Sequence, residues 1–184
     1  EYNRMTKMVS DMLFLAQADN NQLISDRVIF DLSSEVIKVF DFFEAWAEER
    51  NIMLKLNGIP CLIEGDPQMF RRAINNLLSN ALRYTPEGHA VTVSIREQEN
   101  YFDLIVENPG KPIPEEHLSR LFDRFYRVDP SRQRKGEGSG IGLAIVKSIV
   151  AAHHGKVHVE SDAHSTRFIL SVPGVKSVNP ISQH

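Results

Sequence analysis

Four of the ten glycines in this 184-residue chain, Gly136, Gly138, Gly140 and Gly142, fall within seven positions, and an apolar run follows at once. Glycine is needed where the backbone takes a positive φ or approaches a ligand closely. The first N–H groups of a helix lack partners and, with the helix dipole, attract anions such as phosphate. The stretch "GEGSGIGLAIV" therefore indicates a loop that leads into a helix and could hold phosphate, although an ordinary flexible loop with a helix cap fits the same residues.

The spacing of these glycines excludes two common nucleotide-binding motifs. The P-loop pattern GxxxxGK[ST] cannot be fitted to them, and their GxGxG spacing differs from the GxGxxG fingerprint of dinucleotide-binding folds. The preceding residues, "DPSRQRKGE", do not form the strand that this fingerprint requires. A glycine loop at the N-terminus of a helix remains as the interpretation.

Two asparagines share one face of a helix predicted at residues 67–84. Asn76 and Asn80 lie four residues apart, and Arg83 extends their stripe. The stripe borders an apolar face that comprises Phe70, Ile74, Leu77, Leu78 and Ala81. Asparagine disfavours helix interiors, and an amide oxygen can ligate Mg²⁺ beside phosphate oxygens. A surface helix with two solvated asparagines is the alternative, and Tyr84 could either stack on a flat ring or close the core.

The composition fits a packed domain and excludes several classes of protein. Hydrophobic residues make up 42% of the chain and charged residues 24%, and the formal net charge is −3. No segment is strongly basic, which argues against nucleic-acid binding, and no apolar run of about 18 residues could span a membrane. Cys61 is the only cysteine, so an internal disulfide and a cysteine-rich zinc site are excluded.

The first predicted helix, at residues 2–18, carries a narrow apolar seam made by Met5, Met8, Met12 and Leu15. Such a seam is typical of one arm of a helical hairpin or of a dimer helix. Three methionines so close could bind Cu(I), but a core seam is the simpler interpretation. The chain opens within this helical sequence, so we interpret it as a piece of a longer protein.

Further elements are predicted after a polar boundary at the residues "DNNQLISDR". Helices are expected at 35–50, 67–84 and 141–154, strands at 28–32, 52–56 and 61–65, and hairpins at 90–108 and 156–172. The expected helix caps are Ser33 or Ser34 for the second helix, Asp66 with Pro67 for the third, and Gly155 as the C′ glycine of the last.

The segment 109–140 is a long polar loop with one short helix at 114–122, and a loop of that length inside a compact domain is usually functional. His153 and His154 close the last helix, where we expect them to be solvated; a metal-binding pair is the alternative. The tail at 174–184 is polar.

These elements, in this order, resemble the ATP-binding domain of sensor histidine kinases, within the gyrase–Hsp90–histidine kinase–MutL ATPase superfamily, over nearly the whole chain. The stretch "NNLLSNALRYTP" is similar to the N box of this family. The resemblance implies that the amide of Asn80 holds Mg²⁺ and that Asn76, Arg83 and Tyr84 contact the nucleotide.

Two more boxes of the family are similar to stretches of this sequence. The F box resembles "LFDRFYR", which implies that Phe122 and Phe125 anchor a lid at 109–140 and that Arg127 contacts phosphate. The G2 box resembles "GSGIGLAIV", and the final Gly-(Ser/Thr)-x-Phe element resembles "STRF", which places Thr166 near the adenine. The G2 resemblance implies phosphate binding at Gly138, Gly140, Ile141, Gly142 and Leu143.

The family's G1 pattern, Asp-x-Gly-x-Gly, is altered here to Asn108-Pro109-Gly110-Lys111-Pro112. The family's Asp accepts a hydrogen bond from the adenine amino group, which Asn108 can do only without charge assistance. Pro112 lacks a backbone N–H where the family has Gly. We therefore expect Asn108, Gly110 and Pro112 to contact the nucleotide, with reduced affinity.

The family's phosphoacceptor motif, His-(Glu/Asp)-Leu-Arg-Thr-Pro, is absent from the sequence. The helix at residues 1–20 resembles the second helix of the hairpin that carries this motif, so the acceptor His is expected on a preceding helix of the same protein, in a homodimer. The sequence most resembles the copper/silver-responsive membrane sensor kinases, which implies a cytoplasmic fragment of an inner-membrane sensor protein that itself contacts neither membrane nor nucleic acid.

The expected fold is an α/β two-layer sandwich at 26–173, with a mixed sheet of about five strands, three helices on one face and the helix at 1–20 before it. The resemblance implies an enzyme that binds ATP and Mg²⁺, with Asn80 and Arg127 as catalytic residues, and passes the γ-phosphoryl group to a His and then to a response regulator. One alternative is a nucleotide-binding docking module without phosphotransfer. A gyrase-type ATPase would need a water-activating Glu on the helix at 67–84, which has none.

Overall fold

The computed structural model describes residues 2–23, 26–128 and 139–175. Most predicted elements are present, with boundaries shifted by a few residues. In chain order they are α1 (Tyr2–Asp19), β1 (Val28–Asp31), α2 (Leu32–Glu49), β2 (Met53–Asn57), β3 (Leu62–Gly65), α3 (Pro67–Tyr84), β4 (Ala90–Glu97), β5 (Tyr101–Pro109), α4 (Glu115–Leu118), α5 (Gly142–Ala152), β6 (Lys156–Ser161) and β7 (Ser165–Pro173).

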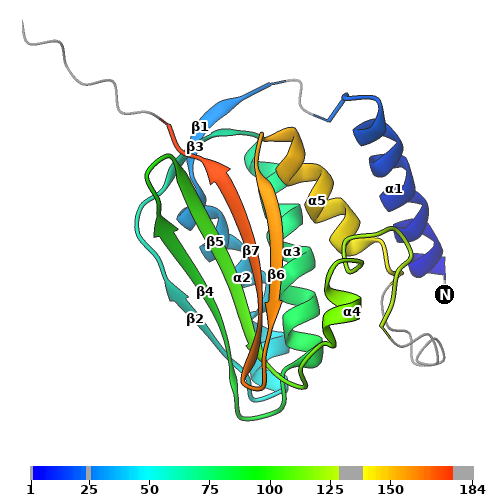
Figure 1. Ribbon diagram of the computed structural model, residues 1–184, viewed down its shortest axis with the longest axis vertical. Coiled ribbons are helices and arrows are strands. Elements are labelled where there is room, and N and C mark those ends of the chain that lie inside the picture. The colour runs from blue at the N-terminus through cyan, green and yellow to red at the C-terminus, as the bar shows by residue number, and fades with distance from the viewer. Residues whose placement is uncertain (1, 24–25, 129–138, 176–184) are drawn as a thin grey trace, which may run out of the picture.

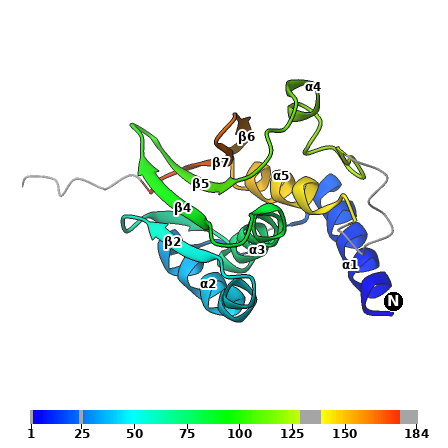
Figure 2. The ribbon, with the colours of Figure 1, turned by 90° about the horizontal axis from the view of Figure 1, so that it is seen from below.

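The main sheet has five strands in the order β2-β4-β5-β7-β6. Strand β2 pairs with β4 in parallel and the other neighbours are antiparallel, so the sheet is mixed. Helices α2, α3 and α5 cover one face of it (Figures 1 and 2). The predicted two-layer sandwich is confirmed. Strands β1 and β3 pair with each other in a separate two-stranded sheet, which the sequence pattern did not distinguish.

Helix α3 lies at the centre of the fold because one of its faces is wholly apolar. Its buried residues are Phe70, Ala73, Ile74, Leu77, Leu78, Ala81 and Leu82. Its start is defined as predicted, since the Asp66 carboxylate accepts hydrogen bonds from the N–H groups of Gln68 and Met69 and Pro67 occupies the first turn. The face of α3 that remains outside the core carries the asparagine stripe.

The N-cap of α2 is Asp31, and the prediction of Ser33 or Ser34 was wrong. Asp31 Oδ1 accepts from the N–H of Ser33 at 3.0 Å and from the N–H of Cys61 at 2.9 Å, so one carboxylate satisfies two backbone donors from different segments. The hydroxyls of Ser33 and Ser34 donate to the same carboxylate. The Asp31 carboxylate thus accepts from four donors, more than the two lone pairs of a serine hydroxyl could satisfy.

Helix α5 ends at Ala152 with His153 as its C-cap, and the C′ residue with a positive φ of +60° is His154, so the prediction of Gly155 as the C′ glycine was wrong by one residue. Gly155 follows and donates its N–H to the Val150 carbonyl at 2.9 Å. A Cβ on Gly155 would lie 2.4 Å from the Ser171 carbonyl oxygen. Gly155 is therefore required by the close approach of β7 rather than by the handedness of the helix end.

His153 is buried, so the prediction of a solvated histidine was wrong. It is 3% exposed and bridges two elements: its Nδ1–H donates to the Ile149 carbonyl at 2.7 Å, and its Nε2 accepts from the Asp66 N–H at 3.0 Å. Gly65 leaves room for it, since a Cβ there would lie 2.2 Å from the His153 ring. Burial lowers the pKa of His153, and the neutral ring with one donor and one acceptor fits both bonds.

Helix α1 packs beside α5 with Phe14 and Leu15 buried (Figure 1). The Arg72 guanidinium holds it in place, with Nη2 2.7 Å from the Asp11 carboxylate and its carbon 4.1 Å from the centre of the Phe14 ring. The other members of the predicted seam, Met5, Met8 and Met12, are exposed, so this seam forms no core within the described residues. No helix in the described ranges is long and apolar enough to cross a membrane.

We predict that His153 makes the stability of the domain fall under mild acid. Because the pKa of His153 is lowered on folding, its contribution is complete above the unfolded value near 6.5 and is lost as the pH falls below it, by at most about 1.4 kcal/mol per pH unit. Urea titrations at pH 7.5 and 5.5 would measure the change in free energy of unfolding. His153→Gln, which does not titrate, should reduce that change, whereas His154→Gln at the exposed neighbour should leave it unaltered. Equal pH dependence in the wild type and His153→Gln would contradict the assignment.

Candidate functional site

A cleft of about 410 Å³ opens between α3, the N-terminus of α5, the adjoining ends of β5 and β7, and the segment that follows β5. The structure brings most of the sequence-predicted site residues together along its walls. They are Asn76, Asn80, Arg83, Tyr84, Asn108, Gly110, Pro112, Arg127, Gly140, Gly142, Leu143 and Thr166. Of the other two, Gly138 falls outside the described residues, and Ile141 is fully buried in the core instead of lining the cleft.

One end of the cleft is formed by the N-terminus of α5. Gly140 has a φ of +74°, and a Cβ on it would lie 3.1 Å from Phe125 Cα, so only glycine fits at this position. Its carbonyl accepts from the Phe125 N–H at 2.9 Å. The Asn76 Nδ2 donates to the Gly142 carbonyl at 3.2 Å and thereby joins α3 to the first residue of α5. The unpaired N–H groups of this helix end are suited to an anion.

The charges on the cleft walls are mostly positive although the whole chain is acidic. Lys7, Arg83, Lys111 and Arg127 line it, and Asp11 is the only carboxylate among the described lining residues. The charge of Asp11 is already balanced by Arg72 at 2.7 Å. The cleft is thus a local positive region in a chain whose net charge is −3.

Lys7 and Asp11 come from α1, a helix that no sequence motif connects with the nucleotide site. Lys7 is exposed, and no ion pair or hydrogen bond of its side chain occurs within the described part of the chain. No signal in the local sequence could have identified it, since its place depends on how α1 packs against α5. The docked helix therefore supplies an ammonium group to the wall of the cleft.

The asparagine stripe of α3 connects the two ends of the cleft. Asn76 lies at the α5 end, Asn80 is one turn further along, and Arg83 and Tyr84 follow. Tyr84 is 47% exposed and lies beside Gly110, where a Cβ would come within 3.3 Å of the Tyr84 carbonyl oxygen. Tyr84 therefore does not close the core, and its ring is available to a ligand.

The other end of the cleft contains a largely apolar recess. Asn108 on β5 is directly opposite Thr166 on β7, and both are buried, 5% and 6% exposed. The apolar lining around them comprises Ile113, Leu121 and Phe168. Asn108 Nδ2 donates to the Pro109 carbonyl at 3.0 Å, so a carboxylate at this position would lose that bond and face the carbonyl oxygen. An apolar recess with two polar groups can hold a flat, partly polar ring such as a nucleobase.

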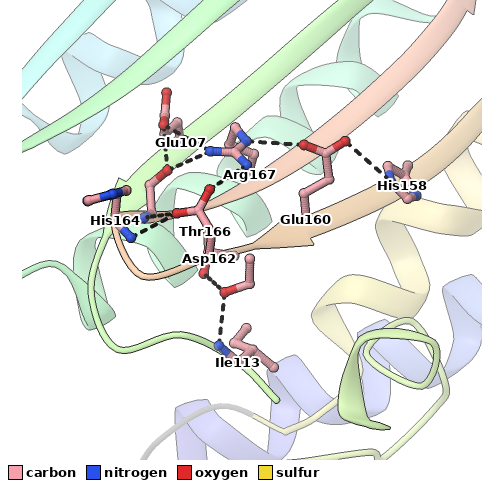
Figure 3. A network of polar contacts seen from close by, with 10 residues as sticks. Glu107, Ile113, His158, Glu160, Asp162, His164, Thr166 and Arg167 are labelled. Atoms are coloured by element: carbon pink, nitrogen blue, oxygen red, sulfur yellow. Dashed lines mark hydrogen bonds and ion pairs between the residues drawn. The ribbon is translucent and has the colours of Figure 1, made fainter. Parts of the chain in front are cut away.

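A polar network behind Thr166 secures this end (Figure 3). Ser161 Oγ accepts from the Ile113 N–H at 2.9 Å and lies 2.8 Å from Thr166 Oγ1. Beside it, Arg167 forms ion pairs with Glu160 and Asp162. Hydrogen bonds from the N–H groups of His164 and Ser165, and then from Arg167, lower the pKa of Asp162. The network fixes the β6–β7 turn and joins it to the segment after β5.

The two predicted lid anchors differ in structure. The Phe122 ring packs edge-on against Phe168 with ring centres 6.2 Å apart, as an anchor should. The Phe125 ring is 53% exposed, so it does not anchor this segment by packing in the core. With a φ of +63°, Phe125 instead contributes through its backbone N–H, which donates to the Gly140 carbonyl. The remainder of the predicted lid, 129–138, lies outside the described residues.

The donor set of the cleft fits a magnesium ion that is bound mainly by the phosphates of a ligand. No group of three or more His, Cys, Asp and Glu residues gathers anywhere in the described ranges, so these residues form no all-protein metal cage. Asn80 offers a neutral amide oxygen in the middle of the cleft. Mg²⁺ commonly takes one or two protein ligands and completes its shell with phosphate oxygens and water.

Comparisons with known proteins agree with this geometry. A family model described as "Histidine kinase-, DNA gyrase B-, and HSP90-like ATPase" matches residues 65–176. The probable sensor kinase SilS of Salmonella typhimurium is 78% identical over 100% of this chain, and the sensor histidine kinase CusS of Escherichia coli K12 is 65% identical over 94%. The chain spans little more than a third of these relatives, 38% and 36% of their lengths.

Among solved structures, the histidine kinase AdeS of Acinetobacter baumannii has the same fold, with a TM-score of 0.78 at 23% identity over 92% of this chain and 78% of that one. The matched family segment begins just before α3 and contains every cleft residue named above except those of α1. Since that segment covers more than half of the sequence, the chain belongs to the family of histidine kinase-, DNA gyrase B- and HSP90-like ATPases.

Proposed function

We propose that this chain is the catalytic ATP-binding domain of a two-component sensor histidine kinase. In this proposal the domain binds Mg²⁺–ATP in the cleft and transfers the γ-phosphoryl group to a His on another helix of the same protein. That His then passes the phosphoryl group to a response regulator. The observation that carries the proposal is the convergence, in one cleft, of the α5 N-terminus, the asparagine stripe and four basic side chains beside an apolar recess.

The cleft orients the nucleotide by its two chemically different ends. Phosphates favour the end with the α5 N-terminus, Lys7 and Arg127, and the base favours the recess at Asn108 and Thr166. Asn80, which lies between them, would hold a magnesium ion, and that ion would neutralise charge on the phosphates. Arg127 then faces the charge of the transferring group.

The transfer breaks the bond between the γ-phosphorus and its bridging oxygen, and ADP leaves with that oxygen and the bonding electrons. A ring nitrogen of the acceptor His attacks with its lone pair and forms the N–P bond, and the ring loses its proton to solvent. In the second step a carboxylate oxygen of the regulator takes the phosphoryl group from the His. Such reactions depend mainly on positioning and charge stabilisation, which this cleft can supply.

The exposed apolar face of α1 suits the partner helix that this reaction needs. A second apolar surface of α1 lies away from Phe14 and Leu15. Its exposed side chains are Tyr2 (83%), Met5 (65%), Val9 (57%), Met12 (49%) and Leu13 (62%). We assign this surface to contacts with the helix that carries the acceptor His and with a second copy of the protein in a homodimer.

By resemblance we further propose that the full protein responds to a metal signal, copper or silver, and that this domain lies on the cytoplasmic side of the inner membrane.

A nucleotide-binding docking module without phosphotransfer is the second candidate, and the altered residues Asn108 and Pro112 favour it. Both candidates require nucleotide binding and differ only in transfer. ATP hydrolysis of the gyrase type has less support, because α3 contains no Glu to activate a water molecule.

We predict that the chain labels a separate polypeptide carrying the acceptor helix when the two are mixed with γ-labelled ATP. Label should be found only on the added polypeptide. Asn80→Ala should reduce the transfer rate by about 100-fold or more, since it removes the proposed magnesium ligand, while Asn75→Ala on the same helix, outside the cleft lining, should not. Binding of ATP without transfer by the wild type would favour the docking module. Full transfer by Asn80→Ala would exclude the assigned role of Asn80.

We predict that Lys7 contributes to nucleotide affinity from α1. Lys7→Gln should weaken binding of an Mg²⁺–ATP analogue about five-fold, as expected for roughly 1 kcal/mol from an exposed charge, and the effect should shrink at high salt. Arg4→Gln, one turn earlier on the same helix and outside the cleft lining, is the matched control. Equal effects of the two substitutions in calorimetric titrations would mean that only the overall charge of α1 matters.

A further inference from the structure

Ser161 does not line the cleft, yet it bonds to two segments that do. It is the last residue of β6 and is paired with Thr166 across the sheet. Its Oγ accepts from the Ile113 N–H at 2.9 Å and lies 2.8 Å from Thr166 Oγ1. Ser161 therefore connects the segment after β5 to the hydroxyl that faces the proposed base recess.

The donor and the acceptor in each of these two hydrogen bonds can be assigned from what each group is able to do. A backbone N–H only donates, so the Ile113 amide occupies one lone pair of Ser161 Oγ. In the described part of the chain, the only group in contact with the Ser161 hydroxyl that could accept its proton is Thr166 Oγ1. When Ser161 donates there, the proton of Thr166 is left for a ligand in the cleft. The opposite arrangement would give Ser161 two incoming protons and leave its own proton without a protein acceptor.

The neighbouring amide is oriented by a similar constraint. Asn108 is the cross-strand partner of Thr166, and its Nδ2 donates to the Pro109 carbonyl at 3.0 Å. A flipped amide would place two acceptor oxygens against each other, so this bond fixes which end of the amide is free. The free atom is Oδ1, an acceptor. The recess therefore presents an acceptor at Asn108 beside a donor at Thr166.

We infer that Ser161 is a positioning residue that makes this recess select adenine over guanine, an inference that rests on the proposed function of the cleft. Adenine presents an amino donor next to a ring-nitrogen acceptor, which complements Asn108 Oδ1 and the Thr166 hydroxyl. Guanine presents a carbonyl acceptor next to an N–H donor and mismatches both groups. Ser161 acts through Thr166, since without it the Thr166 hydroxyl has no fixed polarity.

The test is the ratio of affinities for Mg²⁺–ADP and Mg²⁺–GDP, measured by calorimetric titration of the whole chain. The wild type should bind ADP at least about ten-fold more tightly than GDP. Ser161→Ala should weaken ADP about five-fold and leave GDP nearly unchanged, so that the ratio falls. Ser161→Thr keeps the hydroxyl and should restore the ratio. Ser171→Ala, which removes a hydroxyl that bonds Asp103 on the same sheet, is the control and should not alter it.

Equal losses for ADP and GDP in Ser161→Ala would leave the ratio unchanged and overturn the inference, because they would indicate a purely structural role. Unaltered affinities for both nucleotides would overturn it as well. Should Ser161→Ala fail to fold, Thr166→Val, which removes the other hydroxyl at nearly constant volume, must lower the same ratio, and a retained ratio would again overturn the inference. A wild type that binds neither nucleotide would refute the proposed function itself. A wild type that binds both equally would refute only the selection of adenine.

Discussion

The packing of α3 against α5 is the interaction on which the remainder of the site depends. The apolar faces of the two helices meet in the core, where Ile74, Leu77, Ile145 and Ile149 are fully buried. This contact sets Asn76 beside the first residue of α5, where its amide donates to the Gly142 carbonyl. The same contact aligns the polar edge of α3 with the N-terminus of α5, so that burial of apolar surface creates the polar cleft. His153 strengthens it at the far end, where its ring bonds the start of α3 to the end of α5.

Helix α1 extends this arrangement to the part of the protein that would deliver the phosphoacceptor. One side of α1 packs on the domain through Phe14, Leu15 and the Asp11–Arg72 pair, and Lys7 lines the cleft. Another side is apolar and exposed. If nucleotide phosphates bind Lys7, they favour the docked position of α1, and docking in turn favours the nucleotide, because such coupling is reciprocal. The position of one helix would thereby connect occupancy of the cleft with the availability of a partner surface.

The features that could be predicted from the sequence are those that depend on local residue spacing. The stripe at Asn76 and Asn80, the Asp66 cap and the glycine at 140 each follow from residues within one or two turns, and the structure contains all three features. The features that the sequence did not predict depend on contacts between distant segments. His153 looked solvated because it ends a helix, and it is buried because Gly65 leaves space for its ring. Lys7 and Ser161 gave no local signal, since one depends on the docking of α1 and the other on a bond to Ile113.

The altered residue Asn108 illustrates why a motif must be interpreted with its neighbours. The sequence alone shows that Asn108 lacks the charge of the family's Asp. In the structure its amide donates a hydrogen bond to the Pro109 carbonyl, which would repel a carboxylate at the same position. The proposed function requires that a nucleotide occupy this cleft with its phosphates at the α5 end and its base at Asn108. Titration of ¹⁵N-labelled protein with an Mg²⁺-bound, non-hydrolysable ATP analogue tests that directly. We predict that the largest chemical-shift changes fall on the backbone amides of Gly140, Gly142 and Leu143 and on the side-chain amides of Asn80 and Asn108. Chemical-shift changes confined to the groove between α1, α2 and α3 around Phe42, with these signals unmoved, would contradict this placement of the nucleotide.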